Sequence, residues 1–240
     1  MTQKTINVLH LYPNSMNIYG DMGNVLTIKR RLEWHGYQPN VIRYNQGDEF
    51  PTEVDIVIGG GGQDSGQLAV QDDLVKIKDQ LQELATGGTP MLVICGLYQL
   101  FGHRFLTSDG TEIKGIGLLD VDTIAGSERM IGNIITDSDD FGPIVGFENH
   151  SGKTTLGPNA TPLAKVRLGA GNNGQDETEG ARQHNIIGSY LHGSLLPRNP
   201  KIADWLIEKA VINRYGQFKA AGIDDSIATK ARQTALKLPR

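Results

Sequence analysis

Runs of hydrophobic residues alternate with helically spaced ones over the first 95 residues of the chain. The runs are rich in β-branched residues and predict strands. These predicted strands span residues 5–11, 39–44, 54–58 and 90–94. The intervening pattern predicts a helix over 21–35, ended by Gly36, and a second helix that ends before Gly87. Alternation of this kind is typical of βαβ units, so we predict a parallel sheet covered by helices on both faces.

The pattern changes after about residue 117, where short strand candidates are separated by turn residues. They span residues 117–122, 131–136, 144–149, 163–168 and 185–191. We expect antiparallel additions to the same sheet, and therefore one domain, residues 1–215, that ends with a helix over 199–215. A tail, residues 216–240, follows, with a helix predicted to begin near Asp224.

Composition excludes several classes of protein. Hydrophobic residues, at 38%, and 30 glycines make up about half of the 240 residues, as in an ordinary globular protein. The 23 Lys and Arg face 27 Asp and Glu, a net charge of -4, so no overall positive field would hold nucleic acid. One cysteine cannot form an internal disulfide, and the N-terminal apolar run is too short for a signal peptide or a membrane span. We expect a cytoplasmic protein without membrane insertion.

The charge is unevenly distributed along the chain. Residues 214–240 have six Lys or Arg against two Asp, a net +4, which leaves -8 for residues 1–213. A terminal helix of this composition is either solvated or docked on a partner, and the sequence leaves both readings open.

Cys95 is the first candidate for chemistry. It directly follows the apolar strand 90–94 and precedes Gly96, where a helix is predicted to begin. At such a strand-to-helix turn a nucleophile projects above the sheet edge, and the next backbone amide can stabilise an oxyanion. The helix N-terminus also favours the thiolate. The alternative is a buried structural cysteine, a common fate of this residue type, but the position at the strand end favours the nucleophile.

A thiolate nucleophile needs a base, and the sequence offers two good candidates among its histidines. His192 follows the strand candidate 185–191, so we predict it at the same edge of the sheet. His150, predicted in a polar loop after another apolar strand, is the second candidate. His35 and His184 are expected at the surface.

A run of four glycines, residues 59–62, follows the strand 54–58. Its amides could supply a second oxyanion donor. The run does not fit the dinucleotide motif G-x-G-x-x-G, and GFENHSGKT at 146–154 has five residues where a phosphate-binding P-loop requires four. No Cys or His cluster has metal-ligand spacing. We therefore expect no nucleotide, metal or cofactor site.

In combination these motifs resemble a known family. The glycine loop GGGQD after one strand, CGLYQL after the next and SYLHG after a late strand are similar to class I (triad) glutamine amidotransferases. With GFENHSG they resemble the branch related to cobyric acid synthase. The resemblance implies an α/β fold of the flavodoxin-like three-layer type, with a central, mostly parallel sheet and antiparallel additions.

Two further segments narrow the resemblance within that branch. LYPNSMNIYGDMGN at 11–24 and SERMIGN at 127–133 resemble the short, stand-alone glutaminase subunits of lipid II isoglutaminyl synthase. The resemblance covers roughly residues 5–215 and leaves the tail outside.

The resemblance implies roles for individual residues. Cys95 would be the nucleophile and His192 the general base and acid. Many class I enzymes place a Glu two residues after the histidine to orient it, whereas this chain has Ser194 there. We expect Ser194 to take no part, because a hydroxyl cannot supply the negative charge that a carboxylate offers an imidazolium. What orients His192 is left open.

Other roles concern the substrate. Gly60 or Gly61, together with Gly96, would hold the oxyanion. Gln99 would help to shape the glutamine pocket, and Arg129 matches a family arginine that meets the substrate glutamine. The segment 147–152 would line the same pocket.

The implied reaction is hydrolysis of L-glutamine through a cysteine thioester, with ammonia delivered to an acceptor. No ATP-binding motif is present, so the resemblance implies a heterodimer with a Mur-ligase-like synthetase of the MurT type. That partner would amidate D-glutamate of lipid II to D-isoglutamine in peptidoglycan synthesis.

Three other readings stay open. One is a cobyric or cobyrinic acid-type amidotransferase, although those enzymes add an N-terminal ATP-binding domain and this chain begins its first strand at about residue 5. The second is a γ-glutamyl hydrolase that acts without a partner. The third is a non-catalytic flavodoxin-like module in which Cys95 is structural.

Overall fold

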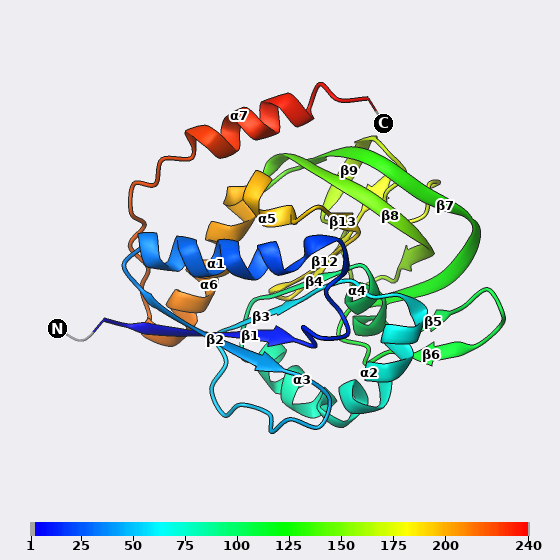
Figure 1. Ribbon diagram of the computed structural model, residues 1–240, viewed down its shortest axis with the longest axis horizontal. Helices are drawn as coiled ribbons and strands as arrows, with labels where there is room; N and C mark the ends of the chain where they lie inside the picture. Colours follow the sequence, from blue (N-terminus) through cyan, green and yellow to red (C-terminus); the bar gives the residue numbers. More distant parts are fainter. Residues whose placement is uncertain (1–2, 240) are drawn as a thin grey trace.

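A six-stranded sheet forms the centre of the protein, which is described here over residues 3–239 by a computed structural model (Figure 1). Its strand order is β11-β12-β4-β3-β1-β2, and only β11 is antiparallel to its neighbour. The strands are β1 (Thr5–Leu11), β2 (Gln38–Tyr44), β3 (Ile56–Gly59), β4 (Met91–Ile94), β11 (Ala181–Gln183) and β12 (Ile186–Ser189). The predicted parallel sheet and α/β class are confirmed.

Helices cover both faces of this sheet, with α1 and α6 on one side and α2 and α3 on the other (Figure 1). The helices are α1 (Met22–Trp34), α2 (Asp64–Lys76), α3 (Lys78–Thr86), α4 (Gly96–Phe101), α5 (Leu195–Arg198), α6 (Pro200–Tyr215) and α7 (Ser226–Ala235). One predicted helix is in fact two, because α2 and α3 are separated at Ile77, which has a non-helical ψ of 9°. Within the described residues no helix is long and apolar enough to cross a membrane.

Most of the late strands form a second sheet, so the expected addition to the same sheet is wrong for them. The exception is the candidate 185–191, whose β12 does join the central sheet, although parallel to β4 and not antiparallel. The strands of the second sheet are β5 (Arg104–Leu106), β6 (Glu112–Lys114), β7 (Val121–Ser138), β8 (Gly142–Leu156), β9 (Ala164–Leu168), β10 (Thr178–Glu179) and β13 (Leu191–His192). Two predicted strands merge in β7, which pairs with β8 along nearly its whole length around an irregularity between Ala125 and Met130. The two strands of this long hairpin form backbone hydrogen bonds with each other, and the hairpin arches beside the central sheet (Figure 1).

The carboxyl ends of β1, β3, β4 and β12 meet at one edge of the central sheet. The strands are buried along their length, and β3, β4 and β12 have no exposed residue. Beyond β4, the amide of Cys95 donates to the carbonyl oxygen of Ser189 at 2.8 Å. Loops that follow four different strands therefore lie together, which is where parallel α/β sheets place their sites.

The tail is folded onto the protein. After α6 ends at Gly216, which has a left-handed φ of 78°, the chain crosses to α7, whose closest helical neighbour is α5 (Figure 1). No residue of α7 is fully buried. The predicted helix is confirmed, although it makes only a shallow contact with the rest of the molecule.

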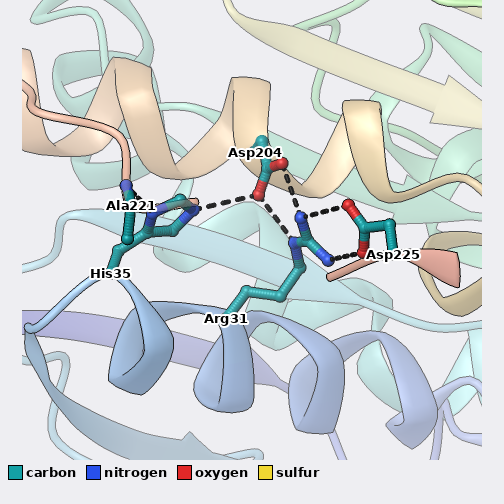
Figure 2. A network of polar contacts seen from close by, with 5 residues as sticks. All are labelled: Arg31, His35, Asp204, Ala221 and Asp225. Atoms are coloured by element: carbon teal, nitrogen blue, oxygen red, sulfur yellow. Dashed lines mark hydrogen bonds and ion pairs between the residues drawn. The ribbon is translucent and has the colours of Figure 1, made fainter. Parts of the chain in front are cut away.

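A buried arginine anchors the start of the tail (Figure 2). The guanidinium of Arg31 in α1 donates to both carboxylate oxygens of Asp204 in α6 at 2.6 Å, and to Asp225 at 2.6 and 3.0 Å. His35, expected at the surface, instead has a side chain only 3% exposed. Its Nδ1 accepts from the amide of Ala221, so its Nε2 carries the proton and donates to Asp204. The tail thus returns to α1 through specific charged hydrogen bonds.

Candidate active site

Cys95 occupies the predicted turn between β4 and α4. Its backbone has φ 50° and ψ -103°, a conformation that is strained for a residue with a side chain. The turn is held by the bond from its amide to Ser189 and by the amide of Gln99, which donates to the carbonyl oxygen of Cys95 at 3.0 Å. The residue is 7% exposed. This is the geometry of a nucleophile elbow, as the sequence predicts.

His192 ends β13 and faces the same edge. A Cβ built on Gly61 would lie 2.8 Å from Cε1 of His192 and 3.1 Å from Cβ of Cys95. The two side chains therefore converge over one glycine, where any larger residue would collide with both. The structure brings together the predicted nucleophile and the predicted base, which are 97 positions apart in the chain.

Asp21 is the group that orients His192, and the sequence analysis missed it. Its Oδ1 lies 3.2 Å from Nδ1 of His192, and both side chains are 1% exposed. Its Oδ2 accepts from the amide of Gly61 at 2.7 Å. Because a carboxylate only accepts, Nδ1 carries the proton, and Nε2 is the nitrogen left to face a thiol. Nε2 is buried, and its neighbour is the side chain of Cys95.

The charge on His192 follows from these neighbours. Burial alone would lower the pKa of the imidazole, but the hydrogen bond to Asp21 and the interaction with Cys95 outweigh it and raise the pKa to about 10. His192 is therefore held as an imidazolium at neutral pH, beside the thiol and the carboxylate. At this edge His192 thus interacts with Cys95 through one side of its ring and with Asp21 through the other.

The glycine loop, residues 59–62, lies beside Cys95, His192 and Asp21. Its Gly61 amide is engaged by Asp21 and is not free to hold an oxyanion in this structure, contrary to one of the two sequence-based alternatives. Gly62 lines the same cavity as Cys95. Its amide nitrogen would lie 2.9 Å from a Cβ built on Gly96, so the backbones of Gly62 and Gly96 are adjacent.

Ser194 points away from the imidazole. Its hydroxyl donates to the carbonyl oxygen of Gly20 at 2.6 Å, which ties the segment after β13 to the segment before Asp21. This contact is structural, in agreement with the expectation that Ser194 supplies no charge to His192.

We expect Ser194→Ala to keep glutaminase activity within about tenfold of the unaltered chain, and to lower stability by about 1 kcal/mol through the lost hydrogen bond. Steady-state kinetics and thermal unfolding measure the two effects. A loss of roughly a hundredfold in kcat, the scale of a positioned acid–base group, would contradict this assignment.

A cavity of about 370 Å³ opens beside Cys95. Arg129 of β7 and Tyr19 line it, and the guanidinium of Arg129 donates to the Tyr19 hydroxyl at 3.1 Å and to Asn149 at 2.7 Å. The Tyr19 ring also meets the His192 ring edge to face, with centroids 4.9 Å apart. Tyr19 was not singled out from the sequence, although it lies in the segment 11–24 that carries the resemblance.

Gln99 also lines this cavity, as the resemblance implies. Its Nε2 donates to the Tyr190 hydroxyl at 3.1 Å, and its Oε1 accepts from Gln67 at 2.7 Å. Because its amide is bound on both sides, Gln99 shapes the wall of the cavity.

His150 lies inside β8, so its predicted place in a polar loop is wrong. The polar stretch around it is a strand because it pairs with β7, where His150 is opposite Met130. Together with Asn149, Ser151 and Gly152 it lines the cavity, as the resemblance implies for this segment. The same strand contains the GKT sequence, so no P-loop is formed there.

Comparison with known proteins identifies the family. The model of the CobB/CobQ-like glutamine amidotransferase domain matches residues 7–200. The chain belongs to this family. It is an enzyme of the glutamine amidotransferase class, and the resemblance drawn from its motifs is confirmed.

Two relatives are similar over most of their length. The chain is 38% identical over 232 residues to the lipid II isoglutaminyl synthase (glutamine-hydrolyzing) subunit GatD of Staphylococcus aureus, covering 96% of this chain and 95% of that protein. It is 38% identical over 215 residues to the subunit of the same name from Streptococcus pneumoniae, covering 88% and 83%. The first alignment extends into the tail, so the expectation that the resemblance stops at residue 215 is wrong.

A cobyric acid synthase of Listeria innocua is 32% identical over 164 residues, which cover 65% of this chain and 32% of that protein. Among solved structures, a glutamine amidotransferase matches with a TM-score of 0.59 at 15% identity, covering 84% of this chain and 98% of that one. The PurLQS structure from Thermotoga maritima matches with a TM-score of 0.57 at 15% identity, covering 86% and 98%. These two structures confirm the fold.

Proposed function

We propose that this chain is the glutaminase subunit of a lipid II isoglutaminyl synthase. The observation that supports this most is the 38% identity to the S. aureus subunit over nearly the full length of both chains. The cobyric acid synthase relative matches over about one third of its own length, which supports that alternative less. The convergence of Cys95, His192 and Asp21 supplies the chemistry that a glutaminase needs.

In the proposed reaction the Cys95 thiolate attacks the side-chain carboxamide carbon of L-glutamine. The carbonyl π electrons move to oxygen, and the resulting oxyanion accepts hydrogen bonds from backbone amides. We assign these donors to Gly96 and Gly62, because the Gly61 amide is bound to Asp21. Gly62 replaces Gly61 in this assignment, and Gly60 stays the alternative donor from the glycine loop.

His192 then gives its Nε2 proton to the nitrogen of the tetrahedral intermediate, the C–N bond breaks, and ammonia leaves a γ-glutamyl thioester on Cys95. Water attacks the thioester while His192 takes the water's proton, and glutamate is released with the thiolate restored. Asp21 stabilises the imidazolium throughout, since it remains within hydrogen-bond reach of Nδ1. Arg129 is placed in the cavity where it can pair with the substrate α-carboxylate.

The ammonia is passed to a partner, in our proposal a Mur-ligase-like synthetase of the MurT type. A second cavity, of about 440 Å³, borders His192 and Tyr19 on one side and α7 on the other. Its α7 side includes Ala231 and Ala235, and Leu238 follows the helix. The tail therefore lies next to the catalytic histidine, where the partner would have to dock to receive ammonia.

Reconstitution tests the proposal directly. The chain, co-purified with the Mur-ligase-like synthetase, should convert lipid II to its D-isoglutamine form with L-glutamine and ATP, releasing one glutamate per amide formed. The matched control is the Cys95→Ala complex, which should amidate only when ammonium is supplied. A chain that hydrolyses glutamine at full rate alone and binds no such synthetase is an independent hydrolase, and the proposal then fails.

Charge reversal tests the role of the tail. Lys230 and Lys237 are exposed, so Lys230→Glu with Lys237→Glu should leave the fold intact and weaken association with an acidic partner surface about tenfold or more at low salt. Titration calorimetry at two salt concentrations measures the effect, and the control is Lys165→Glu with Lys201→Glu, which reverses the same number of charges on exposed lysines outside the tail. Unchanged affinity, with unchanged complex formation after deletion of 220–240, would make the tail a solvated helix.

A further inference from the structure

Met16 lies next to the proposed oxyanion site, and the mechanism above assigns it no role. It follows β1 in a turn, where its amide donates to the carbonyl oxygen of Tyr12 at 2.8 Å. Its exposed fraction is 0%, so its side chain cannot touch the substrate in this structure. Any effect of Met16 on the reaction must therefore pass through the residues that it contacts.

The side chain of Met16 packs against the two glycines whose amides are the proposed oxyanion donors. A Cβ built on Gly62 would overlap Sδ of Met16, and one built on Gly96 would lie 2.8 Å from its Cε. Atoms do not pack this closely, so Met16 fills the space that a side chain at either position would need. The thioether therefore lies against both glycine backbones at once.

Hydrogen bonds fix the direction of each amide. In a trans peptide the N–H points opposite to the carbonyl group that precedes it. The carbonyl oxygen of Gly61 accepts from the amide of Ile18 at 3.1 Å, so the Gly62 N–H points away from Ile18. The first turn of α4 holds the carbonyl oxygen of Cys95, and the Gly96 N–H points away from that turn in the same manner.

The packing of Met16 sets the separation of the two amides. The nitrogen of Gly62 and Cε of Met16 both lie within 2.9 Å of the position that a Cβ on Gly96 would occupy. The glycine loop, the start of α4 and the thioether therefore meet at one point. A longer or branched side chain in place of Met16 would push the loop away from α4, and a shorter one would leave a gap into which the loop can move.

The chemistry of a thioether suits this place. It has no donor and is only a weak acceptor, so it does not compete with an oxyanion for the two amide hydrogens. A carboxamide or hydroxyl oxygen in the same place would accept from these amides before the substrate does. Because Met16 is fully buried, it also keeps water, another acceptor, out of the space that it fills.

We propose that Met16 is a positioning residue of the oxyanion site: its buried thioether holds the amides of Gly62 and Gly96 at the spacing that one oxyanion bridges, and offers them no competing acceptor. The inference rests on the proposed thioester reaction, in which these amides are the donors. The oxyanion forms after glutamine has bound, so Met16 acts on turnover and not on the affinity for glutamine.

Two substitutions separate the acceptor from the volume of the side chain. Met16→Gln keeps the length of methionine and adds an oxygen, whereas Met16→Leu keeps an apolar side chain of similar volume. We expect Met16→Gln to lower kcat for glutamate release by about a hundredfold or more, the scale of one lost oxyanion donor, and Met16→Leu to restore most of it. An unchanged kcat in a folded Met16→Gln chain would overturn the inference.

Glutamine affinity gives the readout that a general distortion of the cavity would move. It is measured by calorimetry in the full chain with Cys95→Ala, where no turnover occurs. Met16→Gln should change this affinity less than about threefold. A loss of affinity as large as the loss of kcat would show that the whole cavity is displaced, and would overturn the inference.

Alkylation of Cys95 by iodoacetamide distinguishes the oxyanion site from the nucleophile. The thiolate forms a bond to the methylene carbon while iodide leaves with the electron pair, and no carbonyl becomes an oxyanion. The rate in Met16→Gln should therefore stay within about twofold of the unaltered chain while kcat falls. Parallel losses would place the effect of Met16 on Cys95 itself and contradict the proposal.

A second set of variants does not depend on Met16→Gln being folded. Gly62→Ala places a Cβ against Sδ, so it should lower kcat about a hundredfold, and combining it with Met16→Ala should recover at least about tenfold of that loss. A double variant no more active than Gly62→Ala would overturn the inference. Met91→Ala is the control for a cavity in the core, because Met91 is equally buried but begins β4 at the end remote from Cys95, and it should keep its kcat.

These experiments follow glutamate release by the chain together with its synthetase, and none depends on the identity of the acceptor. A chain that shows the effects of Met16 but amidates no lipid II would leave the inference intact and refute the proposed acceptor. Conversely, lipid II amidation at an unchanged rate in folded Met16→Gln would leave the proposed function intact and refute the role of Met16.

Discussion

Cys95→Ala and Cys95→Ser should each reduce glutaminase turnover by roughly 10⁴-fold or more while the protein remains folded. In the proposed reaction the thiolate forms the covalent bond to substrate, and neither a methyl group nor an un-ionised hydroxyl can replace it. Cys95 is only a small part of the buried core, so thermal unfolding should change little. Glutamate release in a coupled assay measures the effect, and turnover retained in either variant would rule out Cys95 as the nucleophile.

His192→Ala is the matched test of the base. It should be nearly as inactive as Cys95→Ala, and the double variant should lose little more, because residues that act as a unit are strongly non-additive. His150→Ala should keep a much higher kcat, since its Nδ1 is bound to the carbonyl oxygen of Gly152, whereas Nδ1 of His192 is bound to the carboxylate of Asp21. The reverse order of activities would make His150 the base.

Asp21→Asn should lower kcat/KM by roughly 10²–10⁴-fold with little change in the fold. The asparagine oxygen can still accept from the Gly61 amide, but its NH₂ group then faces Nδ1 and favours the wrong tautomer of His192. Ser194→Ala, whose hydroxyl lies next to the same segment, is the control that should remain active. A near-normal kcat/KM in Asp21→Asn would show that Cys95 and His192 are sufficient for catalysis without Asp21.

The pH profile gives this prediction a second readout. Asp21 and Cys95 raise the pKa of His192 to about 10, so removing the charge of Asp21 should move the pKa down toward the ordinary 6.5. The alkaline limb of the activity profile should shift in the same direction.

The stability of the fold should depend on the same ion pair. Because the folded-state pKa of His192 is the raised one, the ion pair stabilises the fold fully below about pH 6.5, and this contribution is lost as pH rises through about 10. The free energy of unfolding, measured across that pH range, should depend less strongly on pH in Asp21→Asn than in the unaltered chain.

Local pattern was sufficient for the central sheet and for part of the site. The strands β1 to β4 are short apolar runs bounded by glycine or turn residues. Helices connect β1 to β2 and β3 to β4, and such crossovers imply parallel strands. Cys95 and His192 could be found because each comes directly after such a run. Parallel strands end at the same edge, so their positions along the chain already implied that they meet.

What the sequence by itself determined about this protein is therefore its α/β class, its candidate nucleophile and base and, through its motifs, its family. The tertiary structure alone decided that most of the late strands form a second sheet, since strand pairing depends on hydrogen bonds between distant segments and not on the pattern within each strand. It alone paired Asp21 with His192 across 171 positions and buried His150 in a strand against the ring of Tyr190. A carboxylate near a helix start and a histidine in a polar stretch look ordinary in a sequence, because charge partners and burial are set by the packing of segments that are remote along the chain.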